Sequence, residues 1–325
     1  MAEQGRMDPE ASIEKPGSPA VYSIGRKPEG TMNENSSRKK VWQPVILIYL
    51  ICFACRCIEY FCIRTDESFF GEAFLHKLAG IAVLIISARH FGYTAESLGF
   101  SKRRAGITIP AGFCLGLACY AVAYGIEIAI LKGRGTGAGL SLYVTSYSVD
   151  GNLGNRTEWI FFLICFLGNI INVLMEEGVF RGLFQKQLEL RYPFAAAAVF
   201  ASALFGLWHC AGPLRSFTDG TSSGMQFAVN LAVLVLTSAL VGFKYALLAR
   251  MTGSLYAGMA DHFVNNTIIN ILHVTGTSAA DELQFIRVSA AQTLSFVIVL
   301  LLFISWKRRT QNAPADTAAD VAKGR

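Results

Sequence analysis

Four polar side chains stand inside apolar stretches of this sequence, where ionisable groups are rare: Glu176 in VLMEEGVFRGLF, His209 in FGLWHC, and His262 and Asn266 in GMADHFVNN. Ionisable residues at membrane depth usually face the interior of a helix bundle and often mark function. A carboxylate in an apolar pocket is a stronger base toward water than one in solution, and a histidine can orient that water. An imidazole and an amide can donate hydrogen bonds to a developing oxyanion. Together these groups could hydrolyse a peptide bond.

The first stretch contains a second carboxylate and a cation. Glu177 and Arg181 are four residues apart, so on a helix they share a face and can form an ion pair. Glu176 lies about 100° further around the same helix and therefore points elsewhere. A helix end that emerges into the membrane interface would also explain these charges.

The other two stretches repeat the spacing of four. Phe205 and His209 share one helix face, and His262 and Asn266 share another. A structural histidine, or amide hydrogen bonds that join helices, would account for either stretch alone.

The rest of the chain has the composition of a membrane protein. It has 325 residues, of which 53% are hydrophobic and 16% charged, against about 25% charged in soluble domains. A membrane-spanning helix needs about 20 mostly apolar residues. Eight stretches meet this need approximately: 43–63, 72–89, 107–131, 158–184, 194–211, 226–248, 254–273 and 287–306. The sequence thus predicts an all-α, polytopic transmembrane helix bundle over residues 41–306.

The two ends are polar. Residues 1–40 and 307–325 show no apolar periodicity, which predicts two disordered tails. The formal net charge is +6, and the basic residues gather in the tails and in alternate loops. This is the positive-inside pattern, which places both termini in the cytoplasm of a multi-pass protein of the cell membrane. It makes the lipid bilayer a partner and argues against nucleic acid.

Helix geometry predicts that the four polar groups converge. Glu176 lies about 16 residues before the turn expected at Tyr192 and Pro193, and His209 about 16 after it, so each is roughly 25 Å from the turn. An antiparallel hairpin brings the two to one height, and the alanines at 195–198 let its helices approach closely. His262 is expected about 13 Å into its own helix, near the bilayer midplane.

Two further features of the sequence have structural explanations. Arg56 and Glu59 are three residues apart and are predicted to form an ion pair on one helix face. All eight cysteines lie in or at the ends of apolar runs, so we expect them to pack as small apolar residues without a disulfide framework.

The motifs resemble those of a known family. EEGVFR fits EExxxR, FGLWH fits FxxxH and HFVNN fits HxxxN, in the order typical of the CPBP (Abi, or CAAX protease) family of intramembrane proteases. The resemblance covers roughly residues 158–275, the expected catalytic half. It implies that Glu176 and His209 activate water and that His262 and Asn266 stabilise the oxyanion. It makes Glu177, Arg181 and Phe205 supporting residues.

The sequence leaves a metal ion and other functions open. Glu176, His209 and His262 could ligate zinc, but no HExxH pairs ligands on one helix turn, and the resemblance favours Glu-activated water without a cofactor. The expected function is an intramembrane endopeptidase acting on a membrane-associated peptide or protein. A non-proteolytic immunity or scaffold protein and, less favoured, a proton-coupled transporter are the alternatives.

Overall fold

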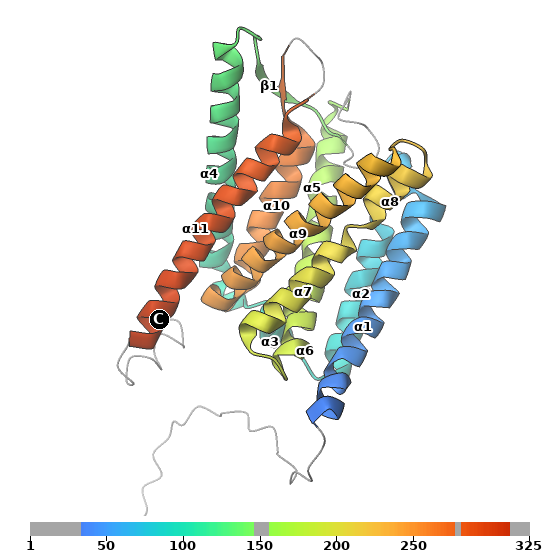
Figure 1. The fold of residues 1–325 in the computed structure, drawn as a ribbon, viewed down its shortest axis with the longest axis vertical. Helices are drawn as coiled ribbons and strands as arrows, with labels where there is room; N and C mark the ends of the chain where they lie inside the picture. Colours follow the sequence, from blue (N-terminus) through green and yellow to red (C-terminus); the bar gives the residue numbers. More distant parts are fainter. Residues whose placement is uncertain (1–33, 146–155, 277–280, 313–325) are drawn as a thin grey trace, which may run out of the picture.

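The computed structural model describes residues 34–145, 156–276 and 281–312. These residues form a bundle of helices with one short two-stranded sheet (Figure 1). In lipid every backbone polar group must be paired within the protein, which favours helices over open sheets. The α-helices are α1 Glu34–Ile58, α2 Leu75–His90, α3 Ala95–Leu98, α4 Lys102–Gly133, α5 Trp159–Glu177, α6 Gln185–Glu189, α7 Phe194–Trp208, α8 Ala211–Thr218, α9 Gly224–Thr252, α10 Tyr256–Ile271 and α11 Gln284–Asn312. The predicted all-α bundle is therefore confirmed.

Six helical segments of the described residues are long and apolar enough to cross a membrane: Lys40–Ile63, Ala95–Gly133, Trp159–Glu189, Phe194–Thr218, Gly224–Thr252 and Gln284–Asn312. The other two expected spans, 72–89 and 254–273, form α2 and α10. Each has 16 residues, or about 24 Å at the helical rise, which is shorter than the roughly 30 Å of hydrocarbon in a bilayer. Both pack between longer helices, α2 against α1 and α5, and α10 against α4, α5 and α9.

A two-stranded antiparallel sheet that the sequence did not indicate lies at one end of the bundle. The strands β1 (Gly139–Leu142) and β2 (Leu272–Thr275) pair antiparallel, with Leu142 opposite Leu272. The expected span 254–273 therefore ends as a helix at Ile271. Each strand has only four residues, and their pairing joins segments about 130 residues apart, so local sequence could not reveal the sheet.

The helices extend into both predicted tails. α1 begins at Glu34 and α11 continues to Asn312, so residues 34–40 and 307–312 are helical, while 1–33 and 313–325 lie outside the described residues. The start of α1 and the end of α11 lie at the same end of the bundle (Figure 1). Long basic side chains let a helix pass beyond the hydrocarbon because they reach the aqueous interface.

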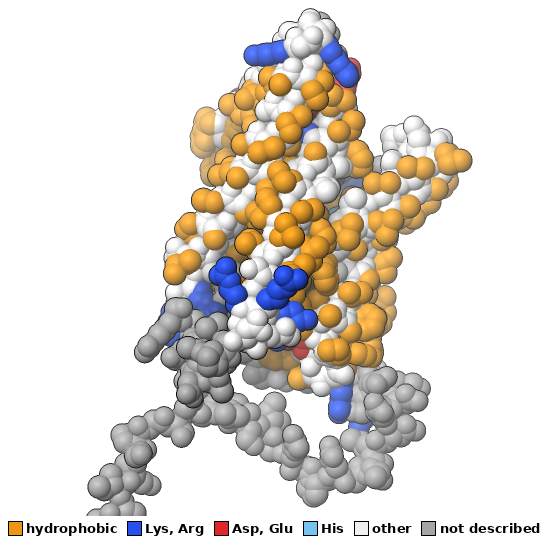
Figure 2. All heavy atoms as spheres, turned by 60° about the vertical axis from the view of Figure 1, so that its left-hand side comes forward, with side chains coloured by type: hydrophobic (Ala, Val, Ile, Leu, Met, Phe, Trp, Pro, Cys, Tyr) orange, Lys and Arg blue, Asp and Glu red, His pale blue; other side chains and the backbone are white. Residues whose placement is uncertain are grey.

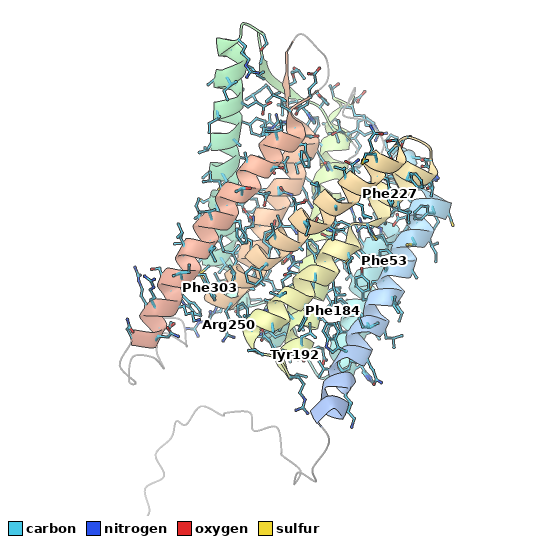
Figure 3. All side chains as sticks on the ribbon, in the orientation of Figure 1. Phe53, Phe184, Tyr192, Phe227, Arg250 and Phe303 are labelled. Carbon is cyan, nitrogen blue, oxygen red and sulfur yellow. The ribbon has the colours of Figure 1, made fainter. Side chains whose placement is uncertain are left out.

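The outer surface has the pattern of a membrane-embedded protein. Figure 2 shows Lys and Arg side chains gathered toward the two ends of the molecule, with a band of hydrophobic side chains between them. At the lower end one basic residue lies over an aromatic ring. Arg250 Cζ lies 5.2 Å from the ring centroid of Phe194, and Phe194 stacks in turn on Phe303 (Figure 3). Six apolar helices and this surface define a multi-pass membrane protein.

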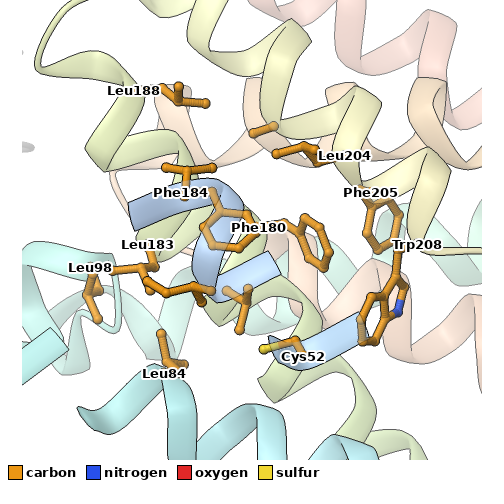
Figure 4. Close-up of a cluster of buried hydrophobic side chains, with 14 of the residues drawn as sticks. Cys52, Leu84, Leu98, Phe180, Leu183, Phe184, Leu188, Leu204, Phe205 and Trp208 are labelled. Carbon is orange, nitrogen blue, oxygen red and sulfur yellow. The ribbon is translucent and has the colours of Figure 1, made fainter. Parts of the chain in front are cut away.

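A buried apolar cluster holds α1, α2, the end of α5 and α7 together (Figure 4). Phe180 contacts Phe184, Phe205 and Trp208 edge-to-face. Close approach of α7 to α9 depends on Gly206, where a Cβ would lie 2.5 Å from the carbonyl oxygen of Val235. Ala197 and Ala198 on α7 are fully buried. All eight cysteines are free.

Candidate active site

Glu176 occupies the last turn of α5 and is only 3% exposed. Trp208 Nε1 donates to its Oε1 at 2.9 Å, and Asn172 Nδ2 donates to its Oε2 at 3.3 Å. Arg56 NH1 lies 3.8 Å from Oε1. Two donors and a nearby cation compensate the charge of this carboxylate, which would otherwise be very costly to bury.

The predicted ion pair between Arg56 and Glu59 is wrong. Glu59 instead accepts from the backbone N–H groups of Leu75 and His76, at 2.9 and 2.7 Å, and contacts His76 Nδ1 at 2.5 Å. The helix changes to π-helical geometry at Glu59–Ile63, and the first N–H groups of α2 are a favourable site for a carboxylate. Arg56 is thereby free to face Glu176.

Glu177 and Arg181 form the predicted ion pair. Arg181 NH1 lies 3.3 Å from Glu177 Oε1, and both side chains are buried. The segment that contains Arg181, Gly178–Phe184, is π-helical, a geometry that often occurs at functional sites. Arg181 reaches α9 through its Nε, which donates to the carbonyl of Gly242 at 3.3 Å. A Cβ at Gly242 would lie 2.6 Å from Arg181 NH2, so glycine makes room for the guanidinium.

His262 lies between the two carboxylates. Its Nδ1 is 2.9 Å from Glu177 Oε1, and its Nε2 is 3.6 Å from Glu176 Oε2. A carboxylate only accepts, so Nδ1 carries a hydrogen and donates to Glu177. A ring that also donates from Nε2 has hydrogens on both nitrogens, and its positive charge would lie between the carboxylates of Glu176 and Glu177. The His262 ring stacks on the ring of Tyr245, with centroids 5.0 Å apart, and this contact holds the orientation of the imidazole.

His209 follows the last residue of α7 and is half-buried. Its Nδ1 lies 2.8 Å from the carbonyl oxygen of Phe205 and must donate to it, which leaves Nε2 as the acceptor of the neutral ring. The ring of Phe205 lies 4.8 Å from that of His209 and 6.1 Å from that of His262, and Arg181 Cζ is 4.0 Å from its centroid.

Asn266 lies one turn beyond His262 on α10 and is half-buried. Its Oδ1 accepts a hydrogen bond from Asn265 Nδ2 at 3.0 Å. Within the described residues Asn266 makes no hydrogen bond to Glu176, His209 or His262. The site thus has a tightly connected part around Glu176, Glu177 and His262, and a less buried side at His209 and Asn266.

The zinc alternative has no preformed ligand group. Among residues 34–145, 156–276 and 281–312, no set of three or more His, Cys, Asp or Glu side chains is placed to hold a metal ion. Glu176, His209 and His262 would have to move before they could act as three ligands.

Several contacts of the site were missed at the sequence level. Asn172 precedes Glu176 by one helical turn, so its spacing could have indicated the contact. Trp208 stands immediately before His209, and its role as a donor to Glu176 depends on how α7 faces α5. Arg56 and Tyr245 come from other helices, and no local pattern connects them with the site.

The fold and these side chains define a multi-pass membrane protein with a buried cluster of glutamate and histidine side chains. Residues 157–268 match the model of the family described as Rce1-like, type II CAAX prenyl endopeptidase. This part of the chain is therefore similar to Rce1-like CAAX proteases, in agreement with the resemblance of its motifs to the CPBP family. The matched segment contains Glu176, His209, His262 and Asn266. No curated protein and no solved structure matches the chain.

Proposed function

We propose that this protein is an intramembrane endopeptidase that hydrolyses a peptide bond in a membrane-associated peptide or protein through water activated by Glu176. The observation that carries the proposal is the buried contact between Glu176 and His262, 3.6 Å apart, in a segment that matches a CAAX protease family. We place the protein in the cell membrane with both termini in the cytoplasm, with lipid and substrate as partners and no nucleic acid.

The chemistry needs a water molecule between Glu176 and the Nε2 atom of His209. Glu176 takes a proton from this water as the oxygen attacks the substrate carbonyl, and His209 accepts a hydrogen bond that orients the nucleophile. His262 Nε2 and Asn266 Nδ2 donate to the oxyanion that forms. Glu176 then gives its proton to the leaving amine, which restores the carboxylate.

The supporting residues hold these groups in place. Glu177 fixes the orientation of the His262 ring by accepting a hydrogen bond from His262 Nδ1. Arg181 balances the charge of Glu177. Phe205 holds His209 through its backbone carbonyl and packs its ring against Arg181. These contacts preorganise the site, which lowers the barrier because the groups do not rearrange during the reaction.

The proposal can be tested by proteomics of membrane peptides in cells that express either the wild-type protein or Glu176→Gln. We expect fragments of at least one membrane-associated peptide in wild-type cells only, because glutamine cannot take the proton of water. Glu96→Gln is the matched control, since Glu96 is an exposed residue of α3, and it should give the wild-type pattern. Identical fragments in all three strains, with biological activity retained, would favour a non-proteolytic role.

Metal removal distinguishes the two water-activating mechanisms. We expect the purified protein to keep cleaving a synthetic copy of the peptide found by proteomics after treatment with a chelator, because Glu176 can accept the proton itself. Metal content measured by mass spectrometry is the second readout. Loss of both bound zinc and cleavage, with recovery on adding Zn²⁺, would instead assign zinc to Glu176, His209 and His262.

A further inference from the structure

A second buried polar network lies beside the site and starts at Lys244 on α9. The side chain of Lys244 is 0% exposed. Its Nζ donates to Asp261 Oδ2 at 2.5 Å, to Gln292 Oε1 at 2.7 Å and to Ser295 Oγ at 3.0 Å. An ammonium group has three donors and no acceptor, so its hydrogen-bonding capacity is complete.

This cation dictates the direction of the amides that follow. Because Lys244 cannot accept, the oxygen of Gln292 must face it, and Gln292 Nε2 points to Asn265 Oδ1 at 2.8 Å. The hydroxyl of Tyr120 donates to the same oxygen at 2.6 Å. The Nδ2 of Asn265 is therefore directed to Asn266, whose Oδ1 accepts at 3.0 Å.

The last amide of this series is the proposed oxyanion donor. With Oδ1 occupied by Asn265, the Nδ2 of Asn266 is the end left for a substrate, and residues 34–145, 156–276 and 281–312 offer it no hydrogen-bond acceptor. A flipped amide would present an oxygen to the developing negative charge. Removing one oxyanion donor costs about 10²–10³ in kcat, and a misplaced acceptor would also repel the oxyanion.

We propose that Lys244, acting through Gln292 and Asn265, sets the orientation of the Asn266 amide for oxyanion stabilisation. Gln292, Asn265 and Tyr120 are positioning residues, and the inference rests on the proposed endopeptidase function. Tyr120 on α4 and Gln292 on α11 lie outside the segment 157–268 that matches the protease family. Through this network α4 and α11, which lie outside the matched segment, would contribute to the reaction.

Hydrogen bonds that only join helices would affect stability and leave the chemical step unchanged. The two roles are separated by kcat and KM of Asn265→Leu for the synthetic cleaved peptide, with purified protein in lipid nanodiscs. We expect kcat to fall about 10-fold to 10²-fold, with KM within about twofold of wild type. Ser295→Ala is the matched control, because Ser295 also bonds Lys244 but lies off the route to Asn266. It should keep kcat within about twofold.

A double-mutant cycle tests whether Asn265 acts through the amide of Asn266. Asn265→Leu should cause little further loss in an Asn266→Ala background, because the amide that it orients is already absent. If Asn265→Leu folds poorly, the double variant Tyr120→Phe with Gln292→Leu takes the place of Asn265→Leu in the cycle. This double variant removes both donors to Asn265 Oδ1. Losses that multiply would overturn the positioning role while Glu176→Gln stays inactive. Full cleavage by Glu176→Gln in the same assay would instead overturn the proposed function.

Discussion

Replacement of Glu176 by glutamine is expected to lower kcat of the purified protein about 10²-fold to 10⁴-fold, the usual contribution of a general base. Glutamine has nearly the same shape, and its oxygen can still accept from Trp208 Nε1 as the carboxylate does. It cannot accept a proton from water. The change therefore removes the chemistry with little change in packing.

This result is checked by single-turnover cleavage of the peptide identified by proteomics, with the thermal midpoint of unfolding measured on the same samples. The midpoint of Glu176→Gln should stay near that of wild type. His209→Ala should also lose activity, because no group then orients the water beside Glu176. If both variants cleave like wild type, these groups do not perform hydrolysis and the assignment fails.

Replacement of Lys244 by methionine is expected to destabilise the protein by about 3–5 kcal/mol, the cost of breaking a buried ion pair from one side. Lys244 and Asp261 are almost fully buried, with 2.5 Å between Nζ and Oδ2. Removing the cation leaves Asp261 as an uncompensated charge among packed helices. The double variant Lys244→Met with Asp261→Leu should recover much of the loss, because no buried charge remains.

The measurement is the free energy of unfolding in a membrane mimetic for wild type, both single variants and the double variant. Lys186→Met is the matched control, since the Lys186 side chain is 42% exposed and its Nζ lies 3.9 Å from Glu189 Oε2; we expect a change below about 1 kcal/mol. A Lys244→Met variant as stable as wild type, or a double variant no better than the worse single one, would contradict a strongly coupled buried pair.

Predictions that depended on one helix agreed with the structure. Glu177 and Arg181 form their ion pair because residues four apart share a helix face. The chain also turns at Tyr192, between the segment ending at Glu189 and α7. The prediction for Arg56 and Glu59 failed because it used the same rule where the helix becomes π-helical and where another helix offers better donors.

The sequence alone determined that the chain forms an all-α membrane bundle and which residues share a helix face, because hydropathy and a period of 3.6 residues are local properties. Only the tertiary structure decided which side chains on different helices interact with each other. Glu177 binds His262 Nδ1, Arg56 faces Glu176, and Lys244 directs amides on α10 and α11. The physical reason is that a hydrogen bond between helices depends on their relative rotation, depth and distance. Many combinations of these bury the same apolar faces, so hydropathy cannot choose among them.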